Sequence, residues 1–185
     1  MAVALPVDQK ASHRKATFSI ALVGNPNAGK TTLFNRLTGL RAKTANFPGT
    51  TIEQRIGNIR LGDRWAELID LPGLYSLNTG NIEERLARDV FLGRNGLGHG
   101  ASAAIVVIDA TNLARNLFLA GEIRELGVPV VIALNMIDIA KRDGLSIDID
   151  ALSRELAAPV VPICARTGEG LDALLNKLES LVRSG

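Results

Sequence analysis

Short apolar runs alternate with segments of helical periodicity along most of the chain. Strands are predicted at residues 18–23, 52–60, 64–69, 103–109, 129–134 and 160–164. Helices are predicted at residues 30–37, 81–92, 113–126, 149–157 and 171–182. Because strands that alternate with helices are typical of βαβ units, the pattern predicts an α/β fold with a mostly parallel six-stranded sheet and helices on both faces.

Two connections depart from that alternation. The second and third predicted strands are separated only by residues 61–63, with the sequence LGD. A short glycine-containing connection between alternating segments predicts an antiparallel hairpin, placed as a ribbon at the edge of the sheet. Residues 41–51 contain Pro48, Gly49 and three threonines without periodicity, and they are predicted to form a loop.

Composition places these elements in one domain. The 185 residues are 46% hydrophobic, so we expect a flexible leader at residues 1–16 and a single domain at residues 17–185. The net charge of +2 comes from 21 basic and 19 acidic residues spread along the chain, which offers no concentrated field to nucleic acid. The longest apolar stretch, residues 128–140, is shorter than the roughly 18 to 20 residues of a membrane span, so direct membrane insertion is not expected.

Residues 24–31, GNPNAGKT, match the pattern G-x-x-x-x-G-K-[ST] between a predicted strand and a predicted helix. That context is typical of a Walker A loop, in which backbone N–H groups and a helix N-terminus surround phosphates. Lys30 is expected to reach the β and γ phosphates, and Thr31 to bind magnesium. The alternative is a glycine-rich turn that matches by chance. The predicted phosphate-binding residues are Gly24, Asn25, Pro26, Asn27, Ala28, Gly29, Lys30, Thr31 and Thr32.

Two other segments complete a magnesium and phosphate site. Asp70 and Gly73 follow the third predicted strand in the form D-x-x-G, which supplies a carboxylate for magnesium and an N–H that can sense a γ phosphate. A threonine of the loop before the hairpin should reach the same magnesium ion, and Thr50 and Thr51 are both candidates. With Gly49, these threonines are assigned to the nucleotide site.

A further pattern predicts recognition of guanine. Asn135, Met136 and Asp138 lie at the end of the fifth predicted strand as N-x-x-D, where a carboxylate can accept hydrogen bonds from N1–H and N2–H of guanine. Adenine lacks this pair of donors, so Asp138 is expected to select the base. The alternative for this segment is an ordinary polar turn at a strand end.

The loop after the last predicted strand is the remaining candidate for a contact with the base. Its backbone N–H groups are expected to meet the guanine carbonyl, although Cys164 is as consistent with a small buried thiol as with a direct contact. In this order the motifs predict a Ras-like P-loop GTPase fold that binds GTP or GDP with Mg²⁺. The residues of this loop are Cys164, Ala165 and Arg166.

Longer strings resemble one family, the cytosolic G domain of the bacterial ferrous iron transporter FeoB, over residues 18–175. They are GNPNAGKTTLFNRLTG at 24–39, NFPGTTIE at 46–53, IDLPGLYSL at 69–77 and the segment at 109–138. The resemblance implies a GTP-binding and GTP-hydrolysing switch domain at the cytoplasmic face of the inner membrane, soluble as this fragment. It also implies partners that this sequence does not include, a helical regulatory domain and a membrane region.

The same resemblance places the magnesium-sensing threonine at Thr51 and implies a potassium-activated class in which Asn27 helps to bind K⁺. Leu74 stands where Ras-type enzymes carry a glutamine that orients water, and it cannot hydrogen-bond. Pro26 would crowd an arginine finger, so a monovalent cation is the expected device for neutralising charge. With no side-chain base evident, slow turnover is expected. The predicted catalytic residues are Lys30, Asn27, Thr51 and Gly73.

Three other functions remain open at the level of the sequence. A nucleotide-sensing regulatory module would bind GTP and GDP through the same residues and hydrolyse GTP only incidentally. A ribosome-assembly GTPase of the same fold would be expected to carry an appended basic domain. An ATPase would have to account for Asn135 and Asp138.

Overall fold

The computed structural model describes residues 18–78, 80–94 and 99–184, so the predicted leader at residues 1–16 lies outside the described residues. Within them the chain forms one seven-stranded sheet in the order β2-β3-β4-β1-β5-β6-β7. Its strands are β1 (Phe18–Gly24), β2 (Ala42–Asn46), β3 (Glu53–Leu61), β4 (Arg64–Asp70), β5 (Ala103–Asp109), β6 (Val130–Asn135) and β7 (Val160–Pro162).

The sheet is parallel from β4 through β1, β5 and β6 to β7, and antiparallel on the side of β2 and β3. The predicted hairpin is confirmed, since β3 pairs with β4 up to the register Leu61 to Arg64. It is not the edge of the sheet, however, because β2 pairs antiparallel with β3 outside it.

The prediction of six strands and of a loop throughout residues 41–51 is therefore wrong at β2. Four of the five side chains of Ala42–Asn46 are exposed and the first is half-buried. A strand held at the edge by backbone pairing alone carries no apolar alternation, and that alternation is the signal on which the sequence prediction depends.

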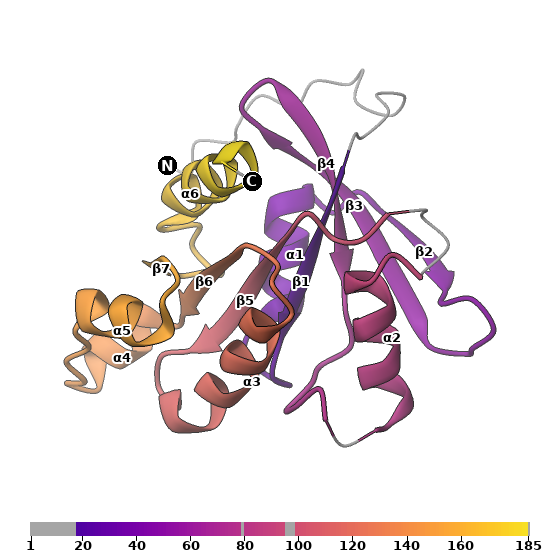
Figure 1. The fold of residues 1–185 in the computed structure, drawn as a ribbon. Helices are drawn as coiled ribbons and strands as arrows, with labels where there is room; N and C mark the ends of the chain where they lie inside the picture. Colours follow the sequence, from indigo (N-terminus) through magenta and orange to yellow (C-terminus); the bar gives the residue numbers. More distant parts are fainter. Residues whose placement is uncertain (1–17, 79, 95–98, 185) are drawn as a thin grey trace.

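Six helices form in the described part of the chain, and they cover both faces of the sheet (Figure 1). Two of them, α1 and α6, pack on one face around Leu33, Phe34, Leu174 and Leu178. The others pack on the opposite face. The helices are α1 (Lys30–Thr38), α2 (Ile82–Phe91), α3 (Leu113–Glu125), α4 (Ile137–Arg142), α5 (Ile149–Leu156) and α6 (Leu171–Ser184).

Local signals explain where one of these helices begins and why another was missed. The Asn81 side chain accepts a hydrogen bond from the Glu84 backbone N–H at 2.8 Å, which confirms the predicted cap of α2. Helix α4 has only six residues and begins two residues after β6. Its Ile137, Ile139 and Ala140 continue the apolar run of that strand, so no separate period marks it.

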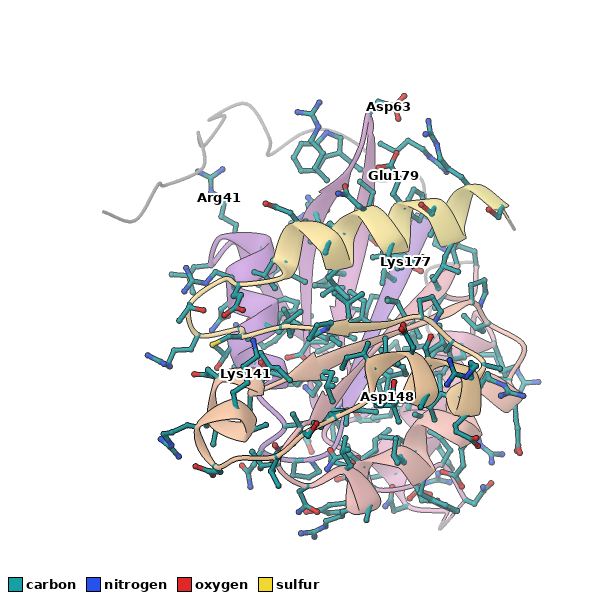
Figure 2. The ribbon with its side chains drawn as sticks, turned by 90° about the vertical axis from the view of Figure 1, so that its left-hand side faces the viewer. Arg41, Asp63, Lys141, Asp148, Lys177 and Glu179 are labelled. Atoms are coloured by element: carbon teal, nitrogen blue, oxygen red, sulfur yellow. The ribbon has the colours of Figure 1, made fainter. Side chains whose placement is uncertain are left out.

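The turn of the hairpin and helix α6 meet at the end of the sheet where β4 begins. Figure 2 shows Glu179 of α6 close to the turn that carries Asp63. A Cβ atom added to Gly62, which has φ +60°, would lie 2.3 Å from the Glu179 carboxylate, so a larger residue would be strained there and would displace that side chain. The carboxyl ends of the parallel strands lie at the other end of the sheet, where ligands of open α/β sheets bind.

Candidate nucleotide-binding site

The loop after β1 turns sharply into α1. Asn27 has φ +66° and Gly29 has φ +89°, and Gly29 is the N-cap of the helix. A Cβ atom on Gly29 would lie only 2.2 Å from Nδ2 of Asn135, so the residue must be glycine for steric as well as conformational reasons. The turn leaves the N-terminus of α1 facing the loop, which is the arrangement that favours a phosphate.

The phosphate end of the site contains a nearly buried ion pair. Lys30 Nζ contacts Oδ1 of Asp70, at the end of β4, and their side chains are only 11% and 8% exposed. Thr31 lies in the first turn of α1 with its side chain exposed. The structure therefore brings Lys30, which is adjacent to Thr31 in the phosphate loop, into contact with Asp70 of the D-x-x-G segment. Thr31 and Asp70 are the predicted oxygen donors for magnesium.

Arg55 of β3 is a member of this cluster that the motifs did not reveal. Its guanidinium lies 3.9 Å from Oδ2 of Asp70 and donates a hydrogen bond to Oδ1 of Asn35 at 2.8 Å. It also covers the ring of Phe34 at 4.8 Å from the centroid. Arg55 lies four residues after Thr51. Its contacts with Asn35 and Phe34 therefore connect α1 to the strand that follows the loop of Thr51. Because Arg55 lies in a strand of alternating pattern, nothing in the nearby sequence indicated its contacts with Asp70 and Asn35.

The loop that contains Gly73 packs directly on the phosphate loop. The Leu74 N–H donates to the carbonyl of Gly24 at 3.1 Å, and a Cβ atom on Gly73 would lie 3.1 Å from Cγ of Pro26. The Leu74 side chain is 2% exposed and belongs to the core between the sheet and α3. A leucine side chain in the core has no group that could hydrogen-bond to a water molecule at the phosphates.

A buried carboxylate of α3 fixes the continuation of that loop. Glu122 is 8% exposed and accepts hydrogen bonds from Oγ of Ser76 at 3.0 Å, from the backbone N–H of Leu77 at 2.7 Å, and from Nδ2 of Asn78. Sequence reasoning missed this residue. The available signal was an acidic side chain on the same helical face as the buried Leu119.

The loop before the hairpin distinguishes its two threonines. The Thr50 hydroxyl donates to the carbonyl of Phe47 at 3.1 Å and accepts from the N–H of Ile52 at 3.1 Å. The Thr51 side chain is exposed, and no hydrogen bond from it to another described residue is present. Gly49, with φ +72°, turns this loop at the surface. Among the described residues, the Thr50 hydroxyl therefore hydrogen-bonds within the loop, whereas the Thr51 hydroxyl does not.

Asn135 connects the two ends of the site. The side chain is 3% exposed; Nδ2 donates to the carbonyl of Ala28 at 2.9 Å, and Oδ1 accepts from the N–H of Ala165 at 2.9 Å. Met136 follows with φ +62° and opens α4. The asparagine therefore holds the phosphate loop and the loop after β7 in one arrangement, a role that the sequence pattern did not distinguish from contact with a base.

Asp138 lies in the first turn of α4, at the surface. Its Oδ2 accepts a hydrogen bond from Nη2 of Arg166 at 3.1 Å. That guanidinium is the main reason why the pKa of Asp138 is below its usual range, with a smaller contribution from Cys164. Cys164 itself is 2% exposed, as expected for a buried thiol.

The loop after β7 is also held from α1. Nε of Arg36 donates to the carbonyl of Ala165 at 3.4 Å, and Nη2 of the same residue donates to the carbonyl of Arg166. The loop is thus fixed through Asn135 and Arg36, while the Arg166 side chain remains 78% exposed. A seven-stranded sheet with these loops at its carboxyl end defines a G domain of the Ras-like P-loop GTPase class.

The particular family follows from comparison with known proteins. The chain belongs to the family described as ferrous iron transport protein B, whose N-terminal model matches residues 18–178. The Fe(2+) transporter FeoB of Salmonella typhimurium is 45% identical over 160 residues, which are 84% of this chain and 20% of that protein. The chain thus spans about a fifth of the length of the curated relatives it matches.

Solved structures confirm the Ras-like fold. The cytosolic domain of the T. maritima FeoB iron transporter in a GDP form matches with a TM-score of 0.83 at 40% identity, and the match covers 91% of this chain and 64% of that one. The FeoB G domain from Methanococcus jannaschii matches with a TM-score of 0.77 at 34% identity, over 91% of this chain and 99% of that one. Among the described residues, no helix is long and apolar enough to cross a bilayer.

Proposed function

We propose that this G domain binds GTP and GDP with Mg²⁺ and hydrolyses GTP with the assistance of K⁺. The observation that carries the proposal is the convergence of Lys30, Asp70 and Asp138 on one end of the sheet, joined by the two hydrogen bonds of Asn135. A solved relative from T. maritima in a GDP form supports the choice of nucleotide.

The oxygen donors fit magnesium. Thr31, Thr51 and Asp70 offer two hydroxyls and one carboxylate, the ligand types that a hard divalent cation prefers. Bound Mg²⁺ would neutralise negative charge on the phosphates. On binding of the nucleotide, Lys30 would leave the carboxylate of Asp70 for the phosphate oxygens, and the loop at residues 46–51 would bring Thr51 to the magnesium ion.

The residues near Asn27 also fit a monovalent cation. Asn27 is exposed on the phosphate loop in a left-handed conformation, and its amide oxygen would be a ligand for the cation. Oδ1 of the nearby Asn25 is buried without a hydrogen-bond partner among the described residues. K⁺ would supply positive charge where Pro26 leaves no room for an arginine finger.

The protein's own residues orient the reaction without a side-chain base. Lys30 would neutralise charge on the γ phosphate, and the N–H of Gly73, in the loop that packs on Pro26, would donate to the same group. The water that attacks has no glutamine to orient it, since Leu74 is buried in the core. Slow turnover follows from this arrangement.

The decisive experiment compares phosphate release from GTP in KCl and in NaCl. We expect stimulation by K⁺ that Asn27→Ala abolishes and that Asn58→Ala, an exposed asparagine in the middle of β3, leaves intact. If turnover stays negligible in both salts, the domain is not an enzyme. Stimulation that survives Asn27→Ala would remove this residue from the cation site.

A second function is favoured by one observation, the burial of Leu74. If hydrolysis is incidental, the domain acts as a nucleotide-sensing module whose loops at residues 46–51 and 73–78 change contacts between the GDP and GTP states. Binding of mant-GTP and mant-GDP without turnover in either salt would support this function over the first.

Within the full-length protein, we propose that the domain is the GTP-dependent switch of a ferrous iron transporter. It would lie at the cytoplasmic face of the bacterial inner membrane and act on helical regulatory and membrane regions. The name of the Salmonella typhimurium relative and the family match support this assignment. Loss of iron uptake on replacing Lys30 by Ala in the full-length protein would test it.

A further inference from the structure

The carboxylate assigned to guanine already has a partner in the protein. Nη2 of Arg166 donates to Oδ2 of Asp138 at 3.1 Å, from a side chain that comes from a different loop. The guanine base needs both oxygens of this carboxylate, because it presents N1–H and N2–H together. A guanidinium presents the same kind of donor to the same atoms.

We propose that Arg166 competes with the guanine base for Asp138 and thereby lowers the affinity of the domain for guanine nucleotides. The inference rests on the proposed function, since it concerns the same carboxylate. Arg166 then acts as a built-in occupant of the base site, which the incoming nucleotide must displace.

The backbone of the loop supports this role because it is fixed while the side chain is free to leave. Ala165 is held through its N–H by Asn135 at 2.9 Å, and the carbonyls of Ala165 and Arg166 accept from Arg36 of α1. The Arg166 side chain is 78% exposed and its partner carboxylate 30% exposed. A side chain on a fixed backbone can move off the carboxylate without disturbing the base-binding loop.

The strength of the pair sets the size of the effect. Exposed ion pairs contribute little, so replacing Arg166 should tighten nucleotide binding by about two- to fivefold. Since the competitor acts on the empty protein, it reduces the fraction of molecules that can bind, and its removal should appear in the association rate. The dissociation rate of bound nucleotide should change little.

The test is stopped-flow binding of mant-GDP with Mg²⁺ to wild-type protein and to Arg166→Gln, which removes the charge and shortens the side chain by two bonds. The control is Arg142→Gln, which removes an equally exposed arginine from α4 whose partner is Asp143 at 3.0 Å. We expect faster association and a lower Kd only for Arg166→Gln, and a difference that shrinks at about 1 M salt because the pair is screened.

The outcomes separate the inference from the function on which it rests. Unchanged or weaker binding by Arg166→Gln, or a gain carried by slower dissociation, would overturn the competition. Weaker binding would in addition identify Arg166 as an ordinary contact of the base. An equal gain in Arg142→Gln would reduce the effect to net charge and overturn it as well. Wild-type protein that binds no mant-GDP at all would instead overturn the assignment of the site.

Discussion

The two ends of the site each carry an aspartate paired with a cation, yet the surroundings of the two pairs differ. At the phosphate end, Asp70 is 8% exposed and contacts Lys30, which is 11% exposed. At the base end, Asp138 is 30% exposed and its partner Arg166 is 78% exposed. In a poorly hydrated site the loss of one charge leaves the other unpaired at a high cost in free energy. Charges in water are screened, so each can exchange its partner for water or another ion at little cost.

The difference indicates a division of labour. The phosphate end is part of what stabilises the fold, because its carboxylate lies beside the buried strand β1, with Asp70 in register with Leu22. The base end contributes little to the fold and mainly selects the ligand. Substitutions at the two ends should therefore separate stability from nucleotide choice.

The largest expected effect is that of Asp70→Asn at the phosphate end. Removing this carboxylate leaves Lys30 without its partner and takes a negative charge away from Arg55, and breaking a buried pair lowers the free energy of unfolding by about 3 kcal/mol. Urea denaturation of the nucleotide-free protein measures the loss.

The matched change at the base end, Asp138→Asn, should leave the urea midpoint unchanged within error. It should instead shift nucleotide preference from guanosine toward xanthosine diphosphate, because the new amide can donate to the base. Equal losses of stability for Asp70→Asn and Asp138→Asn would break the comparison between the two ends.

The sequence motifs predicted which residues lie at the phosphate end and at the base end of the site. They did not predict the ion pairs that Asp70 and Asp138 form there. Apolar alternation and turn signals predicted the strand Ala103–Asp109 to the residue and the hairpin nearly so. The motifs assigned Lys30, Asp70 and Asp138 to the carboxyl ends of strands, and the structure has them at the start of α1, the end of β4 and the first turn of α4. A contact between residues 40 positions apart, such as that of Lys30 with Asp70, depends on the register of β1 and β4, which no local pattern encodes.

What the sequence missed shares a physical cause. Strand β2 is exposed along most of its length, and helix α4 continues an apolar run, so neither has a period of its own. Arg55 and Glu122 occupy ordinary positions of a strand and a helix, and only the packing of distant loops gives them partners. Tertiary contacts of this kind determine how the site residues are arranged, whereas periodicity along the sequence predicts only where helices and strands form.

The next largest effect on the free energy of unfolding is expected at Gly29, where the phosphate loop meets Asn135. In Gly29→Ala, the new Cβ atom would lie 2.2 Å from Nδ2 of Asn135, so the amide must shift and its hydrogen bonds are weakened. Together with the cost of φ +89°, we expect a loss of about 3 kcal/mol in the free energy of unfolding. Thermal or urea unfolding measures it.

Gly39→Ala is the matched control for this substitution. Gly39 also has a positive φ, +62°, but a Cβ atom there would meet no other atom within 4 Å. Only the conformational cost remains, so we expect a loss of about 1 kcal/mol. Similar losses for the two variants would mean that Asn135 moves aside freely and does not join the two ends.

Asn135→Ala should cost less stability than Gly29→Ala. It removes both hydrogen bonds of the buried amide. The carbonyl of Ala28 and the N–H of Ala165 would lose their partners, at a cost of about 2 kcal/mol. Because the shorter alanine side chain would also relieve the clash in Gly29→Ala, the double variant should be less destabilised than the sum of the two single variants. Strict additivity in urea denaturation would contradict this coupling.

The smallest effect is the titration of Asp138, and it tests the base end directly. Arg166 is the main cause of the lowered pKa of this carboxyl group, so Arg166→Gln should raise the pKa toward its usual range. Of the other nearby cations on α4, Lys141 lies 3.8 Å from Glu169 and Arg142 pairs with Asp143, so Arg142→Gln should leave the pKa of Asp138 unchanged. Carboxyl NMR over the acidic range measures these values.

The sign of the accompanying effect on stability is fixed by the direction of that shift. A carboxyl group whose pKa is lower in the folded state stabilises the fold above its unfolded pKa, and this contribution is lost as the pH falls through the folded value. The wild type should therefore lose slightly more stability than Arg166→Gln between neutral and strongly acidic pH, and high salt should reduce the difference. An Asp138 pKa that is the same in both proteins would show that the guanidinium does not rest on the carboxylate in solution, and the base end would then be open to guanine without competition.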